Sequence, residues 1–253
     1  MDLGLAGRRA LVWGASRGLG HACAAALAAE GVAVTIAARG LEGVRAAADQ
    51  LGCAGVAADI TTAEGRAAAL AACPAPDILV NNAAGPKPGD FRDWQRGDWL
   101  AALDHMMLGP IEMMRLVLDG MQSRGFGRII NIVSRSVKAP QAELGLSNGS
   151  RAGLVGFTAG LARQTIQYGV TINNLLPGPF ATDAQREHVD GLVAATGRPF
   201  EVIWAERVAG NPARRFGDPK ELGAWCAFVC SHYGGYVTGQ NLLIDGGDYR
   251  GTF

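Results

Sequence analysis

The chain has 253 residues, and its 23 basic and 23 acidic side chains give a formal net charge of zero. This balance offers no basic surface for nucleic acid or for an anionic membrane, and no apolar run reaches the roughly 18 residues of a membrane span. The first residues lack a secretory signal, so a cytoplasmic protein is expected. Five scattered cysteines indicate buried thiols, and no metal site is expected.

The first structured stretch combines a short strand, a glycine-rich turn and a helix. Residues 10–13 are apolar, Gly14, Gly18 and Gly20 follow, and an alanine-rich helix runs to Gly31. Glycine lets the backbone turn sharply and lets a ligand approach without a Cβ in the way. The turn therefore directs backbone N–H groups and the positive end of a helix dipole at one spot, which suits a pyrophosphate.

Short apolar runs then alternate with longer helical patterns, which is typical of a parallel sheet covered by helices. Further strands are predicted over residues 32–37, 55–58, 78–80, 128–133, 170–176 and 242–244. Helices are predicted up to about residue 51, up to residue 72, and over residues 94–124, 147–168 and 219–230. The helix over 94–124 should kink near Gly109 and Pro110. Residues 183–211 are interpreted as a helical lid, and no linker divides residues 1–253, so one domain is expected.

Six short motifs occur along the chain in a fixed order. They are Gly14-x-x-x-Gly18-x-Gly20, Asp59-Ile60, Asn-Asn-Ala-Ala-Gly at 81–85, Asn-Ile-Val-Ser at 131–134, Pro177-Gly178-x-x-x-Thr182, and Thr-Gly-Gln with Asp-Gly-Gly at 238–247. Together they resemble the short-chain dehydrogenase/reductase family, in its 3-oxoacyl-reductase-like form, over nearly the whole chain. The resemblance implies an α/β fold: a Rossmann-like, doubly wound, seven-stranded parallel sheet with helices on both faces.

The resemblance also implies a binding site for a nicotinamide dinucleotide. The glycine turn would hold the pyrophosphate, and Asp59 and Ile60 the adenine. Asn82 and Ala83 would contact the adenosine side through their backbone, and Pro177, Gly178 and Thr182 would contact the nicotinamide. The residues implied at this site are Gly14, Ser16, Arg17, Gly18, Leu19, Gly20, Arg39, Asp59, Ile60, Asn82, Ala83, Arg151, Pro177, Gly178, Phe180 and Thr182.

The end of the second predicted strand indicates which dinucleotide is preferred. An acidic residue there accepts hydrogen bonds from the adenosine ribose, whereas a cation suits a 2′-phosphate. Ala38 takes the acidic position, Arg39 follows it, and Arg17 in the glycine turn adds a second guanidinium. Because arginine binds phosphate bidentately and stays charged, NADP(H) is predicted in preference to NAD(H).

The catalytic positions depart from the family pattern, in which a tyrosine moves the proton and a lysine four residues later supports it. Ser134 stands where the family's serine belongs, but Ser147 and Arg151 replace the tyrosine and the lysine. Met106 replaces an asparagine, and His105 beside it is expected to face away from the site. Ser134, Ser147 and Arg151 are therefore the predicted catalytic residues. Ser147, a water or the substrate itself would handle the proton.

Other proton donors and other functions stay open. Lys138, Glu143, His188 and His105 are candidate donors on or near the expected substrate side. The favoured function is an NADP(H)-dependent oxidoreductase that transfers hydride between the nicotinamide and a carbonyl or alcohol. The alternatives are a catalytically silent nucleotide-binding subunit and a non-redox enzyme on the same fold.

The helix after Ser147 carries glycines in its interior, which indicates close packing against another backbone. In the family this helix and the one before it form a dimer interface, and the carboxyl-terminal strand forms a second. The resemblance therefore implies a homotetramer that acts on a small-molecule substrate.

Overall fold

The computed structural model describes residues 1–252, in which seven parallel strands form one sheet in the order β3-β2-β1-β4-β5-β6-β7. The strands are β1 (Arg9–Trp13), β2 (Ala33–Ala38), β3 (Ala54–Ala57), β4 (Ile78–Asn82), β5 (Gly127–Ile132), β6 (Val170–Pro177) and β7 (Asn241–Ile244). The strand order reverses between β1 and β4. A ligand site is expected at the carboxyl ends of the strands beside this reversal. The predicted doubly wound sheet is confirmed.

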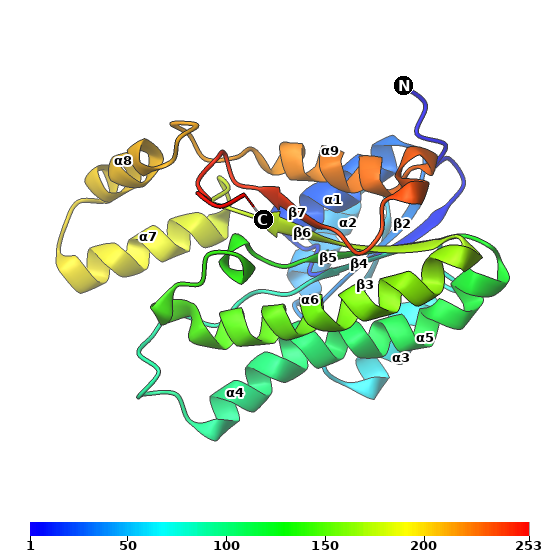
Figure 1. Cartoon of the computed structure of the whole chain (residues 1–253), viewed down its shortest axis with the longest axis horizontal. Helices are drawn as coiled ribbons and strands as arrows, with labels where there is room; N and C mark the ends of the chain where they lie inside the picture. The colour runs from blue at the N-terminus through cyan, green and yellow to red at the C-terminus, as the bar shows by residue number, and fades with distance from the viewer. Residues whose placement is uncertain (253) are drawn as a thin grey trace.

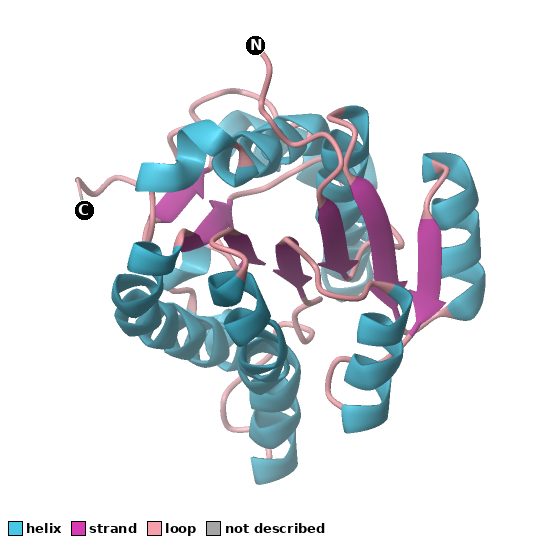
Figure 2. Ribbon diagram, turned by 90° about the vertical axis from the view of Figure 1, so that its right-hand side faces the viewer, coloured by secondary structure: helices cyan, strands magenta, loops and turns pink. Residues whose placement is uncertain are grey.

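Helices cover both faces of this sheet (Figures 1 and 2). They are α1 (Gly18–Ala29), α2 (Leu41–Leu51), α3 (Ala63–Ala72), α4 (Arg96–Leu103), α5 (Gly109–Ser123), α6 (Gly145–Thr165), α7 (Asp183–Thr196), α8 (Phe200–Gly210) and α9 (Pro219–Cys230). Helices α1, α2 and α9 pack on one face, and α3, α5 and α6 pack on the other. Most predicted boundaries agree with these to within about two residues.

Alternate residues of the central strands supply two separate apolar cores. Val12, Ile36 and Val80 face α1 and α9, whereas Leu11 and Leu79 face α5 and α6. Side chains of successive strand residues point to opposite faces, so a strand buried on both sides reads as a continuous apolar run. Within residues 1–252, every helix is too short or too polar to cross a lipid bilayer.

A row of asparagines crosses the sheet inside the second core. Asn81 Nδ2 donates to Asn131 Oδ1 at 2.9 Å, and Asn131 Nδ2 donates to Asn174 Oδ1 at 2.9 Å. Asn174 Nδ2 continues the row to Asn241 Oδ1 at 2.9 Å. Leaving a buried amide without a hydrogen bond is costly, so the row favours the observed pairing of β4 to β7 beside the site.

The predicted break near Gly109 and Pro110 is a π-helical turn over Asp104–Leu108. The N–H of Gly109 donates to the carbonyl of Asp104, five residues earlier, and Pro110 has no N–H with which to continue an α-helical pattern. A π turn contains one residue more than an α turn and is frequent at functional sites. Side chains within it therefore point in directions that α-helical counting does not predict.

Helices α7 and α8 cover the segment interpreted as a lid. Figure 1 shows them projecting beyond the sheet, beside the carboxyl-terminal segment. Thr182 caps α7 by accepting from the N–H of Gln185 at 3.3 Å. On α8 the ring of Trp204 stacks on Phe200 and meets Phe216 edge-on. The segment is thus two packed helices rather than an irregular loop.

Candidate functional site

The glycine turn between β1 and α1 takes a shape that requires glycine. Gly14 and Gly18 have φ angles of 62° and 64°, where a Cβ is strained. A Cβ on Gly14 would overlap the carbonyl oxygen of Asn82, and a Cβ on Gly20 would overlap that of Gly14. Asn82 Nδ2 also donates to the carbonyl of Gly14 at 2.9 Å, which ties the turn to β4. The turn therefore presents bare backbone and the first turn of α1 to a ligand.

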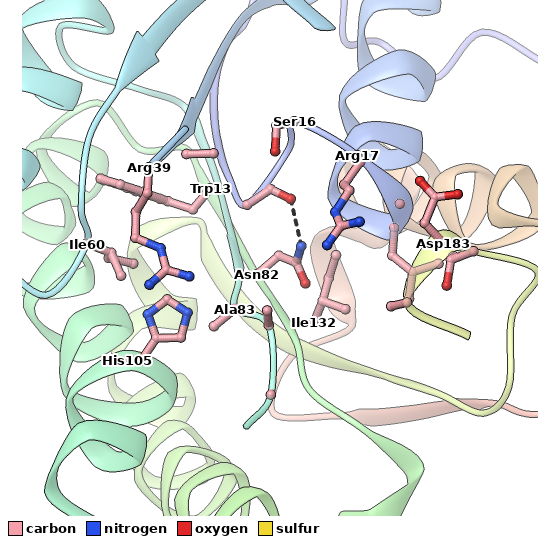
Figure 3. A pocket seen from close by; sticks show the side chains of 18 of the residues that line it. Trp13, Ser16, Arg17, Arg39, Ile60, Asn82, Ala83, His105, Ile132 and Asp183 are labelled. Carbon is pink, nitrogen blue, oxygen red and sulfur yellow. Dashed lines mark hydrogen bonds between the residues drawn. The ribbon is translucent and has the colours of Figure 1, made fainter. Parts of the chain in front are cut away.

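A cavity of about 480 Å³ opens beside this turn along the carboxyl ends of the strands (Figure 3). Twelve of the predicted dinucleotide-site residues line it: Gly14, Ser16, Arg17, Gly18, Leu19, Arg39, Ile60, Asn82, Ala83, Arg151, Pro177 and Thr182. Residues that were not predicted also line it: Trp13, Ala38, Gly40, Ala58, Ala84, Gly85, His105, Ile132, Val133, Asp183 and Ala184. Most of these residues adjoin a motif in sequence, and this position next to a motif could have indicated that they line the site.

Four of the predicted dinucleotide-site residues do not line the cavity. Gly20 and Gly178 serve close backbone packing, since a Cβ on Gly178 would lie 2.6 Å from the Cβ of Asp245. Phe180 is buried in the first core against Gly217, so its predicted contact with the cofactor is not supported. Asp59 is half-buried, and its carboxylate accepts from the N–H and Oγ of Thr61.

One end of the cavity gathers charged and titratable side chains from three elements. Arg39 follows β2, Asp59 follows β3, and His105 lies on the π-helical turn. Figure 3 shows the imidazole of His105 beside the guanidinium of Arg39. Burial alone would raise the pKa of Asp59, but the hydrogen bonds from Thr61 and the charges of Arg39 and His105 leave it below its ordinary value. The carboxylate is therefore ionised near neutral pH.

The structure reverses the expected orientations of His105 and Met106. Met106 is buried among Ala102, Leu146 and the partly buried Trp94, whereas His105 lines the cavity. The reason is the π-helical turn, which rotates these side chains away from the positions that an α-helix would give them. Met106 is thus a core residue, and the expectation that His105 faces away is wrong.

The two arginines predicted to share a phosphate lie apart. Arg17 Nη1 pairs with Glu187 Oε1 of α7 at 2.5 Å, and both side chains are exposed. Figure 3 shows Arg17 between Asn82 and Asp183, on the other side of Asn82 from Arg39. An exposed ion pair contributes little stability, so a bound phosphate can compete for Arg17. Its role at a phosphate stays a prediction.

Arg151 of α6 holds the other end of the cavity wall. Its Nη1 donates to the carbonyls of Ile132 and Val133 at 3.1 and 2.5 Å, and its Nη2 donates to that of Ala83 at 2.8 Å. Within residues 1–252 no carboxylate forms an ion pair with it. Burial lowers its pKa to about 10, which still leaves it charged at neutral pH. The site therefore contains an uncompensated positive charge.

Comparison with known proteins decides the family. The family model described as enoyl-(acyl carrier protein) reductase matches residues 14–248. Over 98% of this chain and 99% of the relative, the sequence is 34% identical to 3-oxoacyl-[acyl-carrier-protein] reductase FabG of Vibrio harveyi. The chain belongs to the short-chain dehydrogenase/reductase family.

Two further relatives of this short-chain dehydrogenase/reductase are similar along nearly their whole length. NADPH-dependent reductase BacG of Bacillus subtilis is 28% identical over 96% of this chain and 98% of its own. L-Sorbose reductase from Gluconobacter frateurii, solved with NADPH and L-sorbose, has a TM-score of 0.92 at 27% identity, covering 99% and 100% of the two chains.

Both serines predicted to be catalytic use their oxygen as an acceptor. Ser147 is buried, and its Oγ accepts from Arg151 Nε at 3.0 Å. Ser134 Oγ accepts from the N–H of Ser136 at 3.1 Å, at the start of a short 3-10 helix. Each hydroxyl keeps its own proton for donation. Ser147 Oγ and Arg151 Nη2 both lie near Gly85 of the cavity wall, within 4 Å of where a Cβ there would be.

Three of the other candidate donors lie outside the cavity. Lys138 Nζ lies 5.7 Å from the ring centre of Tyr249, and the exposed Glu143 accepts from the N–H of Gly89 through its backbone carbonyl. Burial and the charge of Arg207 lower the pKa of His188 on α7. None of these residues lines the cavity. Ser134 and Ser147 do not line it either, whereas His105 lines it beside Arg39.

Proposed function

We propose that this short-chain dehydrogenase/reductase is an NADP(H)-dependent oxidoreductase that interconverts a carbonyl and an alcohol, with Ser147 and Arg151 in place of the family's tyrosine and lysine. The cavity beside the glycine turn carries this proposal. It runs from the cationic side chain of Arg39, past the amino end of α1, to the buried guanidinium of Arg151. This order of groups matches an adenosine phosphate, a pyrophosphate and a ribose in turn.

The residues of the cavity fit a dinucleotide on three grounds. Gly14 and Gly18 leave no side chain between the backbone N–H groups and a pyrophosphate. Arg39 is exposed beside the cavity and free to meet a 2′-phosphate. Arg151 uses four of its five N–H groups within the protein, which leaves one for a ribose hydroxyl. When bound, NADPH supplies the hydride that reduces the carbonyl.

In the proposed reaction the protein directs the proton and the developing charge. Ser147 donates its hydroxyl proton to the substrate oxygen and recovers a proton from water. Arg151 holds Ser147 in place through Nε, and its uncompensated charge stabilises negative charge on either oxygen. Ser134 donates a second hydrogen bond to the same oxygen. Serine is a weaker acid than tyrosine. The positive charge of Arg151 must therefore stabilise the deprotonated oxygen of Ser147 more strongly than a lysine must stabilise a phenolate.

The substrate class is proposed from the relatives. Named relatives act on 3-oxoacyl carrier-protein thioesters and on acetoacetyl-CoA, and we propose a 3-oxoacyl compound for this chain. The protein is also proposed to be a cytoplasmic homotetramer. Large exposed apolar side chains on α4 to α6 support an association surface: Trp99, Leu100, Leu108, Leu116 and Phe157.

Loss of absorbance at 340 nm tests this function. The purified protein is mixed with NADPH and a panel that includes acetoacetyl-CoA and L-sorbose, with NADH in a parallel series. Oxidation of NADPH that depends on substrate is expected. Tight binding of NADPH that no panel member oxidises would instead favour the silent nucleotide-binding subunit, an alternative that the missing tyrosine supports. Product formation without nucleotide oxidation would favour a non-redox enzyme.

A further inference from the structure

We propose that His105 is the second cationic group of the adenosine 2′-phosphate subsite, beside Arg39, so that NADP(H) affinity depends on pH. The inference rests on the proposed function, since it concerns the same dinucleotide. The sequence predicted Arg17 as the second cation at the 2′-phosphate, beside Arg39. The proposal gives this role to His105.

The π-helical turn creates the subsite. Gly109 N–H reaches back to the carbonyl of Asp104, and the resulting wide turn directs His105 into the cavity while Met106 enters the core. Figure 3 shows the imidazole next to the Arg39 guanidinium and next to Ile60. An anion that binds Arg39 from the cavity therefore comes to lie near a ring nitrogen of His105.

Arg17 lies on the other side of the cavity from Arg39. Its guanidinium pairs with Glu187 at 2.5 Å, and Asp183 adds a second negative charge nearby. Figure 3 places Arg17 and Arg39 on opposite sides of Asn82. A 2′-phosphate at Arg39 thus meets one permanently charged group, Arg39, and one titratable group, His105.

The groups that face His105 determine the sign of the pH effect. Burial and the charges of Arg39 and Arg151 lower its pKa, while Asp59 opposes them. His105 is therefore largely neutral near pH 7 in the free protein. A phosphate placed beside it favours the protonated form and raises its pKa, so binding takes up a proton. The affinity for NADPH should consequently fall as pH rises from 6.5 to 8.5, because the proton becomes harder to supply.

NADH is the matched ligand, since it lacks the 2′-phosphate. The dissociation constants of NADPH and NADH are measured by nucleotide fluorescence at pH 6.5 and 8.5. The proteins are the wild type, His105→Asn and His232→Gln. His232 is an exposed histidine on the 3-10 helix after α9, remote from the cavity in sequence and bonded to the carbonyl of Leu3.

For the wild type we expect NADPH to bind about three- to tenfold more weakly at pH 8.5 than at 6.5, with NADH nearly unchanged. His105→Asn should abolish this difference and weaken NADPH at pH 6.5 by about the same factor, while His232→Gln should behave as the wild type. Calorimetry in two buffers of different ionisation enthalpy should show proton uptake on NADPH binding, absent in His105→Asn.

Three results would overturn the inference. The first is NADPH affinity in the wild type that does not change with pH. The second is an equal loss of NADPH and NADH affinity in His105→Asn, which would place the imidazole against the adenine instead. The third is an unchanged NADPH affinity in that variant. Each of these leaves the proposed function intact, whereas binding of neither nucleotide to the wild type would contradict the proposed function itself.

Discussion

Arg151 Nε donates a hydrogen bond to Ser147 Oγ at 3.0 Å, across one turn of α6. The same guanidinium joins the carboxyl ends of β4 and β5 through the carbonyls of Ala83, Ile132 and Val133. A single buried cation therefore fixes the geometry of the cavity wall and polarises the hydroxyl proposed as proton donor. In the proposed function the pair takes the place of the family's tyrosine and lysine, with different chemistry.

Ser147→Ala should lower turnover far more than it lowers nucleotide affinity. Removing one positioned proton donor costs about 10²–10⁴-fold in rate, whereas the nucleotide contacts of the glycine turn remain. The measurement is kcat by NADPH oxidation, together with the NADPH dissociation constant. Ser150→Ala is the control: Ser150 is equally buried on α6, but it bonds to the carbonyl of Leu146. Equal turnover in both variants would exclude Ser147 as the donor.

Arg151→Lys should destabilise the protein although it keeps the charge. A lysine ammonium has three donors on a flexible stem and cannot reproduce the planar fork that reaches three carbonyls and Ser147. Loss of one or two charged hydrogen bonds predicts a free energy of unfolding lower by about 2–4 kcal/mol.

Urea denaturation measures this change, and Arg163→Lys is the matched control. Arg163 is exposed in the last turn of the same helix, so its replacement should change the free energy of unfolding by less than about 0.5 kcal/mol. Similar stability of the two variants would show that the Arg151 fork is not a structural element.

Glu221→Gln should reduce stability at neutral pH and have a smaller effect in acid. The carboxylate accepts from Arg215 and from the N–H of Asp218 in the capping box of α9, and these bonds lower the pKa of Glu221 to about 2. A lowered pKa stabilises the folded state above the ordinary glutamate pKa, and the contribution declines as pH falls toward 2.

Thermal unfolding at pH 7 and pH 3 tests the sign. The variant should melt about 2–4 °C below the wild type at pH 7, with a smaller gap at pH 3. Glu201→Gln, an exposed change in the first turn of α8, should show little effect at either pH. A gap that widens in acid would contradict the assignment.

The proposed homotetramer should appear in light scattering at micromolar concentration as a particle of about four times the 26.3 kDa of one chain. Leu116→Glu on the exposed face of α5 should shift this mass toward dimer or monomer, because it places a charge on the proposed apolar interface. A wild-type monomer would rule the assembly out.

Local sequence signals predicted the sheet and the glycine-rich turn correctly. The positive φ angles of Gly14 and Gly18 need glycine whatever the rest of the chain does. Strands that are buried on both faces can be recognised in the sequence as short apolar runs. These features depend on residues that are close in sequence.

Features set by distant contacts were not predictable. Phe180 packs against Gly217 rather than at the cavity, and Arg17 turns toward Glu187, 170 residues further along the chain. His105 lines the cavity against expectation, on a π-helical turn that changes the helical count. Gly109-Pro110 marked a break in the helix but gave no indication of its type.

The most direct test of the central claim is a fluorescence titration of the wild-type protein with NADPH at pH 6.5, with NADH in parallel. The account predicts micromolar or tighter binding of NADPH and weaker binding of NADH. The glycine turn binds the pyrophosphate of both nucleotides, whereas Arg39 binds the 2′-phosphate that only NADPH carries. Failure of both nucleotides to bind would contradict it, since the cavity would then not be a dinucleotide site.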